Sequence, residues 1–522
     1  MRIDLEELPS DPALLQQAVR ELAAALTTKN AEIEKLHALI KQLQRSQFGR
    51  RSEQLDADQL QLGLEDLEQA VAAVDAAQEA AGPAAETSSR RPPTRRNRGA
   101  LPAHLPRIEV VVDVDVEDKA CPCCGGSLHV IGEDRSEMLD VVPAQYRVKV
   151  IRRPRYGCRA CEGAVVQEPA PERPIDGGMA TEALIAQVLV AKYSEHLPLY
   201  RQAQVFARHG IELDRSTLSN WVGRACWWLE PLYERLLARI LGSTKIFADD
   251  TPLPVLDPGR GRTRTGRLWA YAVDDRPWNG PAPPAVAYVY ALDRKGERPA
   301  THLAGFAGIL QVDGYGGFKR LAGNGPSGQV RLAFCWAHCR RHFYDCHQAT
   351  KSPIAFEALR QISRLYAVEE EIRGRPAEER LAARCERSRP IVDALQAWLS
   401  AQLERISGKS SLAEAIRYTL RHWGGLGLFL DDGRVELDTN AVERSIRPIA
   451  LGRKNSLFAG SDGGARHWAI VASLINTAKL HAVEPFAWLK DVLERVVSGQ
   501  TKAHQLDDLL PWQWKANAPV NP

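Results

Sequence analysis

Five short apolar segments between residues 245 and 334, including those that lead into Asp249 and Asp313, constrain the fold of this chain most strongly. The segments at 245–248, 267–273, 285–292, 309–312 and 330–334 contain the β-branched and aromatic residues typical of strands. Helical patterns near 299–306 and from 335 onward accompany them. The expected order is three strands, helix, strand, helix, strand and helix, which is an α/β arrangement.

This order is that of a ribonuclease-H-like mixed sheet. Asp249 follows the first strand and shares a strand face with Phe247, and Asp313 follows the fourth strand. Pro252 and Pro254 are expected to stop the first strand. Aspartates at strand ends are often turn residues, so neither carboxylate alone indicates a site.

A third carboxylate, Glu443, lies in the segment 435–460 among cations. Asp438 or Thr439 can cap a short helix there, which places Asn440, Glu443 and Arg447 on one face. Arg444 flanks the glutamate, and Arg453 and Lys454 follow after an expected proline-containing break. A lone acid among cations is usually a surface ion pair. Its combination with two aspartates at strand ends instead indicates a shared metal site.

Asp249, Asp313 and Glu443 are therefore the candidate catalytic residues and the candidate ligands of Mg²⁺ or Mn²⁺. Mg²⁺ prefers hard oxygen ligands and keeps several waters. Two such ions can activate an attacking oxygen and stabilise a leaving oxygen in phosphoryl displacement. The attacking group can then be water or a DNA 3′-hydroxyl.

The first 80 residues carry a heptad pattern that predicts a coiled-coil arm for self-association. The seam is formed by Leu15, Val19, Leu22, Leu26, Lys29, Ile33, Leu36, Ile40 and Leu43. A single amphipathic helix packed on its own protein is the alternative. Residues 81–107 form a basic linker, disordered by composition, whose Arg95 and Arg96 either contact DNA phosphates or are simply solvated.

Two cysteine pairs predict a structural zinc module at 108–170. Cys121 and Cys124 are joined by two residues, as are Cys158 and Cys161, and four thiolates close a tetrahedral Zn²⁺ site. Cys123 is an alternative ligand. A basic strand between the pairs, followed by Arg152 and Arg153, is either a DNA surface or a solvated face.

Residues 171–242 read as helices, with a pair around 199–228 that is like a helix-turn-helix. Generic helix packing explains this pair equally well. The core is expected to span 243–480, with an all-α insertion at about 350–429 and a docked tail at 481–522. A second metal site is suggested by Cys335, His338, Cys339, His342, Cys346 and His347, but buried thiols are the favoured interpretation. Six cations of the core are expected to contact DNA phosphates: Arg340, Arg341, Arg444, Arg447, Arg453 and Lys454.

The whole chain has 522 residues, which is enough for several domains, and a formal net charge of +3. The acidic start has no apolar run, and no stretch of 18 apolar residues predicts a membrane span. Ten cysteines, several in close pairs, favour metal ligands or buried thiols in a reducing compartment. The expected location is therefore the cytoplasm, on DNA.

Several long motifs resemble the transposases of family 66 of the bacterial insertion sequences, and the resemblance runs nearly end to end. The motifs are FGRRSEQL (48–55), LPAHLPR (101–107), KYSEHLPLYRQ (192–202), ADDTPLPVL (248–256), LQVDGYGGF (310–318), CWAHCRRHF (335–343), NAVERSIRPIALGRKNSLFAGS (440–461), EPFAWLKDVLERV (484–496) and LLPWQW (509–514). The family's Asp-Asp-Glu triad matches Asp249, Asp313 and Glu443. Where the family usually has Asp-Glu-Thr, this chain has Asp250 after Asp249, so Asp250 can compete for the metal.

The resemblance implies a ribonuclease-H-like fold, a helical insertion before the Glu helix, and DNA cleavage with strand transfer. The expected partners are the element's ends, target DNA, a second copy of the chain and other proteins of the same element. Two alternatives stay open: a dimeric zinc-dependent repressor with a degenerate core, and a ribonuclease-H-like nuclease without joining activity. Three intact acids argue against the repressor, because an acidic cluster repels DNA phosphates.

Overall fold

The computed structural model describes residues 145–157, 165–257, 259–322 and 330–517. The predicted coiled coil, the basic linker with Arg95 and Arg96, and the zinc ligands Cys121, Cys124, Cys158 and Cys161 lie outside these residues. The chain divides into two compact units, Met1–Lys149 and Val150–Pro522, and the description below concerns the second. Within the described ranges, no helix is both long and apolar enough to cross a membrane.

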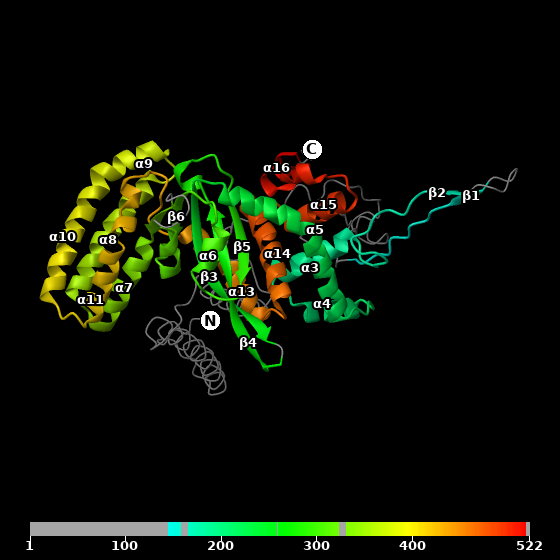
Figure 1. Cartoon of the computed structure of the whole chain (residues 1–522), viewed down its shortest axis with the longest axis horizontal. Helices are drawn as coiled ribbons and strands as arrows, with labels where there is room; N and C mark the ends of the chain where they lie inside the picture. The colour runs from blue at the N-terminus through cyan, green and yellow to red at the C-terminus, as the bar shows by residue number, and fades with distance from the viewer. Residues whose placement is uncertain (1–144, 158–164, 258, 323–329, 518–522) are drawn as a thin grey trace, which may run out of the picture. The chain divides into compact units, whose positions relative to one another are not determined.

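A mixed five-stranded sheet lies at the centre of the second unit (Figure 1). Its strands are β3 (Lys245–Asp257), β4 (Arg262–Val273), β5 (Ala285–Ala291), β6 (Gly308–Val312) and β7 (Val330–Phe334). They lie in the order β5-β4-β3-β6-β7, with β3, β4 and β5 antiparallel and β3, β6 and β7 parallel. The sheet is compatible with the ribonuclease-H-like core expected from the strand order, and α6 (Glu297–His302) supplies the helix expected before β6.

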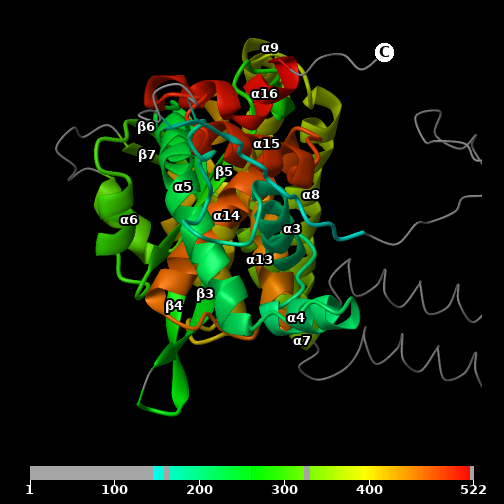
Figure 2. The same cartoon turned by 90° about the vertical axis from the view of Figure 1, so that its right-hand side faces the viewer.

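The prediction that Pro252 and Pro254 end the first strand is wrong. β3 pairs with β4 as far as Asp257, and this β3–β4 hairpin projects beyond the other strands (Figure 2). β6 pairs only with residues 245–247 of β3, and beyond them no other described strand pairs with this edge, which carries an isolated bridge between Val255 and Ala459. Prolines are tolerated at an open edge because no ladder hydrogen bond is lost there. Ala459 N donates to the Pro254 carbonyl from that edge at 2.9 Å.

Helices cover one face of the antiparallel strands (Figure 1). α5 (Arg215–Leu241) and α14 (Asp462–Leu480) pack against these strands, and a second group of helices packs in turn on α5 or α14: α3 (Glu182–Tyr193), α4 (Leu199–Arg208), α15 (Pro485–Val497) and α16 (Pro511–Asn517). α14 packs against β5 and α5. Ser473 and Thr477 of α14 accept hydrogen bonds from the amides of Tyr288 and Val286, at 2.8 and 3.1 Å. The helix thereby provides hydrogen-bond partners for backbone groups at the outer edge of β5, with which a strand of another chain could otherwise pair.

Two sequence predictions in the N-terminal part of this unit need correction. α5 has 27 residues and a buried face along its length, so it is not one of two short helices. The basic strand expected from residue 146 begins only at β1 (Arg155–Gly157), which pairs with β2 (Val165–Gln167). Arg152 and Arg153 precede β1, and both are exposed.

The stretch between β7 and residue 430 is helical, as its apolar pattern predicts. It contains α7 (Trp336–Thr350), α8 (Pro353–Ile372), α9 (Ala377–Ala383), a π-helical turn (Arg384–Ser388), α10 (Arg389–Arg405), α11 (Ser411–Arg421) and α12 (Trp423–Leu426). The N-cap of α11 is Ser410, whose hydroxyl oxygen accepts a hydrogen bond from Ala413 N at 3.1 Å.

A buried arginine ties this helical insertion to the chain that returns to the sheet. Arg384 is fully buried, and its guanidinium donates to both carboxylate oxygens of Glu369 at 2.6 and 2.7 Å. The same guanidinium donates to the carbonyls of Phe429 and Val435 at 3.1 and 2.8 Å. The insertion therefore fixes the path of residues 429–435, directly before the helix that carries Glu443.

The tail is docked, as predicted. Trp488 Nε1 of α15 donates to the Leu509 carbonyl at 3.0 Å. Trp514 Nε1 of α16 donates to Asp491 of α15 at 2.8 Å.

Candidate active site

Asp249 and Asp313 lie at neighbouring positions on two parallel strands. Phe247 of β3 is paired with Gln311 of β6. Two residues further along both strands, the same register reaches Asp249 and Asp313. Parallel strands present their carboxyl ends at the same edge, so the two aspartates lie at the same edge of the sheet, where pairing between β3 and β6 stops. Asp249 is consequently a residue inside a long strand and not at its end, unlike the prediction.

The loop after β6 fixes the orientation of Asp313. Its carboxylate accepts a hydrogen bond from Tyr315 N at 2.8 Å. Gly314 has a φ of +102°, and a Cβ there would lie 2.8 Å from the Tyr418 hydroxyl. That hydroxyl donates to the Asp313 carbonyl at 3.0 Å. The glycine therefore permits a turn that brings α11 of the insertion against the aspartate.

Glu443 lies in the first turn of α13 (Asn440–Asn455), which packs against β3 and β4. Thr439 occupies the predicted N-cap position, but its hydroxyl donates to Glu443 Oε1 at 2.7 Å instead of capping the helix. Asp438 accepts from Asn440 N at 3.1 Å. The break predicted around Pro448 is wrong, since α13 is continuous through this proline. Packing on two strands offsets the hydrogen bond that proline removes.

Gln311 positions the start of α13. This fully buried side chain of β6 donates to the carbonyls of Glu436 and Asp438 at 2.6 and 2.9 Å. Its amide oxygen accepts from Glu436 N at 3.2 Å. Three hydrogen bonds thus join β6, two residues before Asp313, to the segment that leads into the Glu443 helix.

The three carboxylates influence one another electrostatically. Burial, and after it the negative charges of Asp313, Asp250 and Glu443, together raise the pKa of Asp249 to about 7. The hydrogen bond from Asp250 N, at 2.7 Å, opposes the shift. Clustered carboxylates with a raised pKa are typical of sites that bind a cation or move protons.

Asp250 is held by two arginines. Its carboxylate accepts from Arg267 and Arg294, both at 2.9 Å, and its side chain is only 1% exposed. Asp249 has a different environment, since the charges around its carboxylate are negative. This difference supports Asp249 over Asp250 as the metal ligand.

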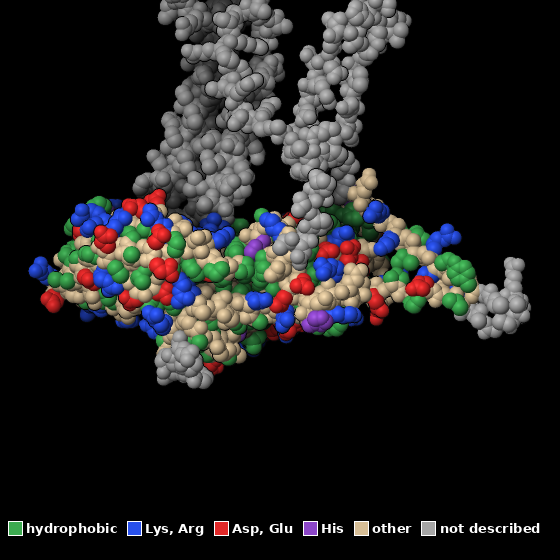
Figure 3. All heavy atoms as spheres, turned by 90° about the horizontal axis from the view of Figure 1, so that it is seen from above, with side chains coloured by type: hydrophobic (Ala, Val, Ile, Leu, Met, Phe, Trp, Pro, Cys, Tyr) green, Lys and Arg blue, Asp and Glu red, His purple; other side chains and the backbone are tan. Residues whose placement is uncertain are grey.

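The predicted DNA-binding cations occupy several surfaces. Arg340 and Arg341 are exposed on α7, and Arg447 and Lys454 are exposed on α13. Arg453 instead points back and donates to the Pro252 carbonyl of β3. On the face seen in Figure 3, acidic and basic side chains are interspersed over the helical insertion.

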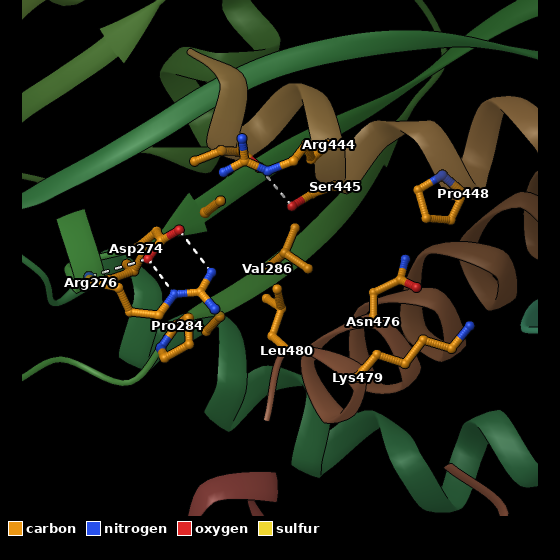
Figure 4. Close-up of a pocket in the computed structure, with 14 residues that line it drawn as sticks. Asp274, Arg276, Pro284, Val286, Arg444, Ser445, Pro448, Asn476, Lys479 and Leu480 are labelled. Carbon is orange, nitrogen blue, oxygen red and sulfur yellow. Dashed lines mark hydrogen bonds and ion pairs between the residues drawn. The ribbon is translucent and has the colours of Figure 1, made fainter. Parts of the chain in front are cut away.

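Arg444 lines a pocket of about 250 Å³ on the side of α13 that faces α14. Figure 4 shows Arg444 near Asp274, which forms an ion pair with Arg276 at 2.8 Å, while Asn476 and Lys479 enter from α14. Arg444 also lowers the pKa of Asp274, after the larger effect of Arg276. The structure therefore places Arg444 against this pocket.

Sequence reasoning missed three positioning residues. The sequence does contain a sign of the role of Gln311, because a polar residue inside an otherwise apolar strand indicates a buried hydrogen-bonding side chain. Thr439 fits the sequence pattern of a helix cap, which does not reveal its hydrogen bond to Glu443. Tyr418 lies 105 residues from Asp313 along the chain, and no local pattern joins them.

Family comparisons agree with the resemblance in the sequence. The model described as "Transposase IS66 family" matches residues 177–467, and "zinc-finger binding domain of transposase IS66" matches 118–162. "Transposase C of IS166 homeodomain" matches 35–110, and "IS66 C-terminal element" matches 473–512. The zinc-finger match includes all four predicted zinc ligands.

Relatives from Sinorhizobium fredii (strain NBRC 101917 / NGR234) are similar over their full length. Uncharacterized protein y4jD is 50% identical over 523 residues, which covers 99% of each chain. Uncharacterized protein y4qI is 42% identical over 524 residues, covering 98% of this chain and 95% of the relative. With a family match across more than half of its residues, the chain belongs to the IS66 family of transposases.

Proposed function

We propose that this transposase binds the ends of its insertion element, cleaves phosphodiester bonds there, and joins the 3′ ends to target DNA. The observation that carries the proposal is that the charges of Asp313, after β6, and Glu443, in α13, both act on the carboxyl group of Asp249 in β3. Their separation in the chain means that the fold, not sequence proximity, assembles this acidic site. A ribonuclease-H-like sheet provides its framework.

The donor set fits Mg²⁺ or Mn²⁺, because it consists of hard carboxylate oxygens. Asp249, Asp313 and Glu443 would hold the ions, which would supply activation of the attacking oxygen and charge stabilisation of the leaving one. The raised pKa of Asp249 reflects first its burial and then the negative charges around it, which a bound cation would neutralise. Gln311 and Thr439 orient Glu443, and the loop after β6 orients Asp313.

DNA contacts are assigned to the basic residues around this site and to the N-terminal regions. Arg340, Arg341, Arg447 and Lys454 would contact phosphates, whose neutralisation releases counterions. We assign the same role to Arg95, Arg96, Arg152 and Arg153, with smaller contributions from Arg444 and Arg453. Cys121, Cys124, Cys158 and Cys161 would hold a structural Zn²⁺, and residues 1–80 would join two copies of the chain. Other proteins encoded by the element are further candidate partners.

The test compares wild-type protein with Asp313→Asn on duplex DNA that carries the element's terminal repeat. We expect the variant to lose strand cleavage and to keep DNA binding in a gel-shift assay. Cleavage by the variant at the wild-type rate would remove the proposed mechanism.

A joining assay with pre-cleaved 3′ ends then separates a transposase from a nuclease. Joined products support the proposal, whereas hydrolysis alone indicates a nuclease. Binding without any cleavage by the wild-type protein indicates a repressor.

A further inference from the structure

A thiol and an imidazole lie beside Glu443, outside the proposed Mg²⁺ site. Among the described residues, Cys335, His338 and Glu443 each offer a ligand atom, and these atoms all lie within 4.8 Å of one another. Cys335 immediately precedes α7, and His338 lies in the first turn of that helix. Glu443 comes from α13, more than a hundred residues further along the chain.

His338 provides a second, independent observation. Its Nδ1 atom is buried and has no hydrogen-bond partner among the described residues. A buried polar atom without a partner costs free energy, and such atoms often mark the place of an ion or water. The nearby thiol of Cys335 is also buried, with 1% of the residue exposed.

Thr439 supports the carboxylate of this group. Its hydroxyl donates to Glu443 Oε1 at 2.7 Å, which leaves Oε2 available as a ligand. Hydrogen bonds to a ligating carboxylate are the usual outer support of metal sites.

We propose that Cys335, His338 and Glu443 form a site for a thiophilic divalent cation such as Zn²⁺, and that its occupation inhibits the enzyme by withdrawing Glu443 from Asp249 and Asp313. A thiolate, an imidazole and a carboxylate are the donors that Zn²⁺ takes, whereas Mg²⁺ does not prefer sulfur or nitrogen. The fourth position would be filled by water. Binding breaks the S–H bond of Cys335, and the proton passes to solvent.

The inhibitory part of this inference rests on the proposed function, but the binding part does not. Sequence spacing favoured buried thiols here, because Cys335 and Cys339 are one helical turn apart. The third ligand comes from a distant helix, so the group becomes visible only in the folded chain.

The binding test uses Co²⁺ as a spectroscopic substitute for Zn²⁺ in the full chain, whose four-cysteine module is first loaded with Zn²⁺. We expect a thiolate-to-cobalt charge-transfer band in wild type and in Asp313→Asn, and its loss in Cys335→Ser and His338→Ala. Cys339→Ser is the matched control, because this neighbouring thiol is equally buried and outside the group. Equal bands in wild type and Cys335→Ser would overturn the site.

The inhibition test adds Zn²⁺ to cleavage reactions at constant Mg²⁺. The cleavage rate of each variant is expressed relative to the rate of the same variant without added Zn²⁺. We expect Cys335→Ser to need at least about tenfold more Zn²⁺ for half inhibition, since even outer support of a metal changes affinity by roughly 10- to 100-fold. The same zinc sensitivity in wild type, Cys335→Ser and His338→Ala would overturn inhibition through this site. A protein that never cleaves would contradict the proposed function, while the cobalt band would still decide the site.

Discussion

Gln311 of β6 donates a hydrogen bond to the Glu436 carbonyl at 2.6 Å, across 125 residues of chain. With its two further bonds to Glu436 and Asp438, this amide couples the strand that ends at Asp313 to the segment before the Glu443 helix. The relative position of two candidate metal ligands thus depends on one buried side chain that touches neither carboxylate.

Replacing Gln311 with leucine removes these three bonds at similar volume. We expect the nicking rate at the terminal repeat to fall roughly 10- to 100-fold, because a small misplacement of a catalytic group has effects of this size. The sheet should remain folded by circular dichroism. Gln348→Leu is the control, since that glutamine is exposed on α7. A Gln311→Leu protein that nicks at the wild-type rate would show that the clamp does not position Glu443.

The raised pKa of Asp249 predicts a pH-dependent stability of the metal-free protein. The folded pKa of about 7 lies above the ordinary value of 3.8, so the folded state binds more protons than the unfolded state between these values. The free energy of unfolding should therefore fall as pH rises from 4 to 7. Asp249→Asn removes this titration, and at pH 8 we expect it to be more stable than wild type, by on the order of 2 kcal/mol.

Urea unfolding without Mg²⁺, at pH 5 and pH 8, measures this difference. Mg²⁺ should stabilise wild type at pH 8 and have little effect on the variant, because only a ligand that binds the folded state adds stability. Asp393→Asn, an exposed aspartate on α10, should behave like wild type. If Asp249→Asn shows the wild-type dependence on pH, this carboxylate does not titrate as proposed.

Arg384→Met tests the link between the helical insertion and the returning chain. The substitution leaves the half-buried Glu369 with fewer partners and removes donors from the carbonyls of Phe429 and Val435. Breaking a buried ion pair from one side costs about 3–5 kcal/mol. Chemical unfolding should show this loss, together with reduced cleavage at temperatures where the protein is still folded.

Arg387→Met is the matched control for that experiment. Arg387 pairs with Glu371 on the exposed surface of the same region, at 2.6 Å. Exposed pairs contribute little, so this variant should unfold like wild type. Equal stability of the Arg384 and Arg387 variants would show that the buried pair does not anchor the insertion.

A Zn²⁺ ion bound in the four-cysteine module should protect the four thiols that hold it from reaction with a thiol reagent. In the part of the chain that the structure describes, Cys385 is exposed, whereas Cys226, Cys335, Cys339 and Cys346 are buried. In a Cys385→Ser background, we expect Cys121, Cys124, Cys158 and Cys161 to react with a thiol reagent only after a chelator has removed the metal. Rapid reaction of these four thiols in the native, metal-loaded protein would remove the zinc assignment.

Local patterns predicted much of the core because they depend on neighbouring residues. Alternation and apolar runs located the five strands and the insertion helices, and aspartates after apolar runs identified Asp249 and Asp313. The rule that proline ends a strand failed at Pro252, because it assumes a partner on both edges. No other described strand pairs with this edge of β3 at that point, and sequence alone does not show where pairing with β6 stops.

The contacts that shape the site could not be predicted because they join distant segments. Gln311 reaches Glu436, Tyr418 reaches Asp313, and Cys335 approaches Glu443, each across about a hundred residues or more. The ion pairs of Asp250 with Arg267 and Arg294 likewise appear only after folding. Long-range hydrogen bonds and ion pairs leave no periodic signal in a sequence, although they decide which carboxylates are paired with arginines.

The most direct measurement of the central claim is nicking of a duplex that carries the element's terminal repeat, with and without Mg²⁺, by wild type and Glu443→Gln. If the metal ions are shared by Asp249, Asp313 and Glu443, wild type should make Mg²⁺-dependent nicks at the end of the repeat. Glu443→Gln should make none, and both proteins should still bind the DNA. Nicking by Glu443→Gln at the wild-type rate, or nicking by wild type that does not need a divalent ion, would contradict the account.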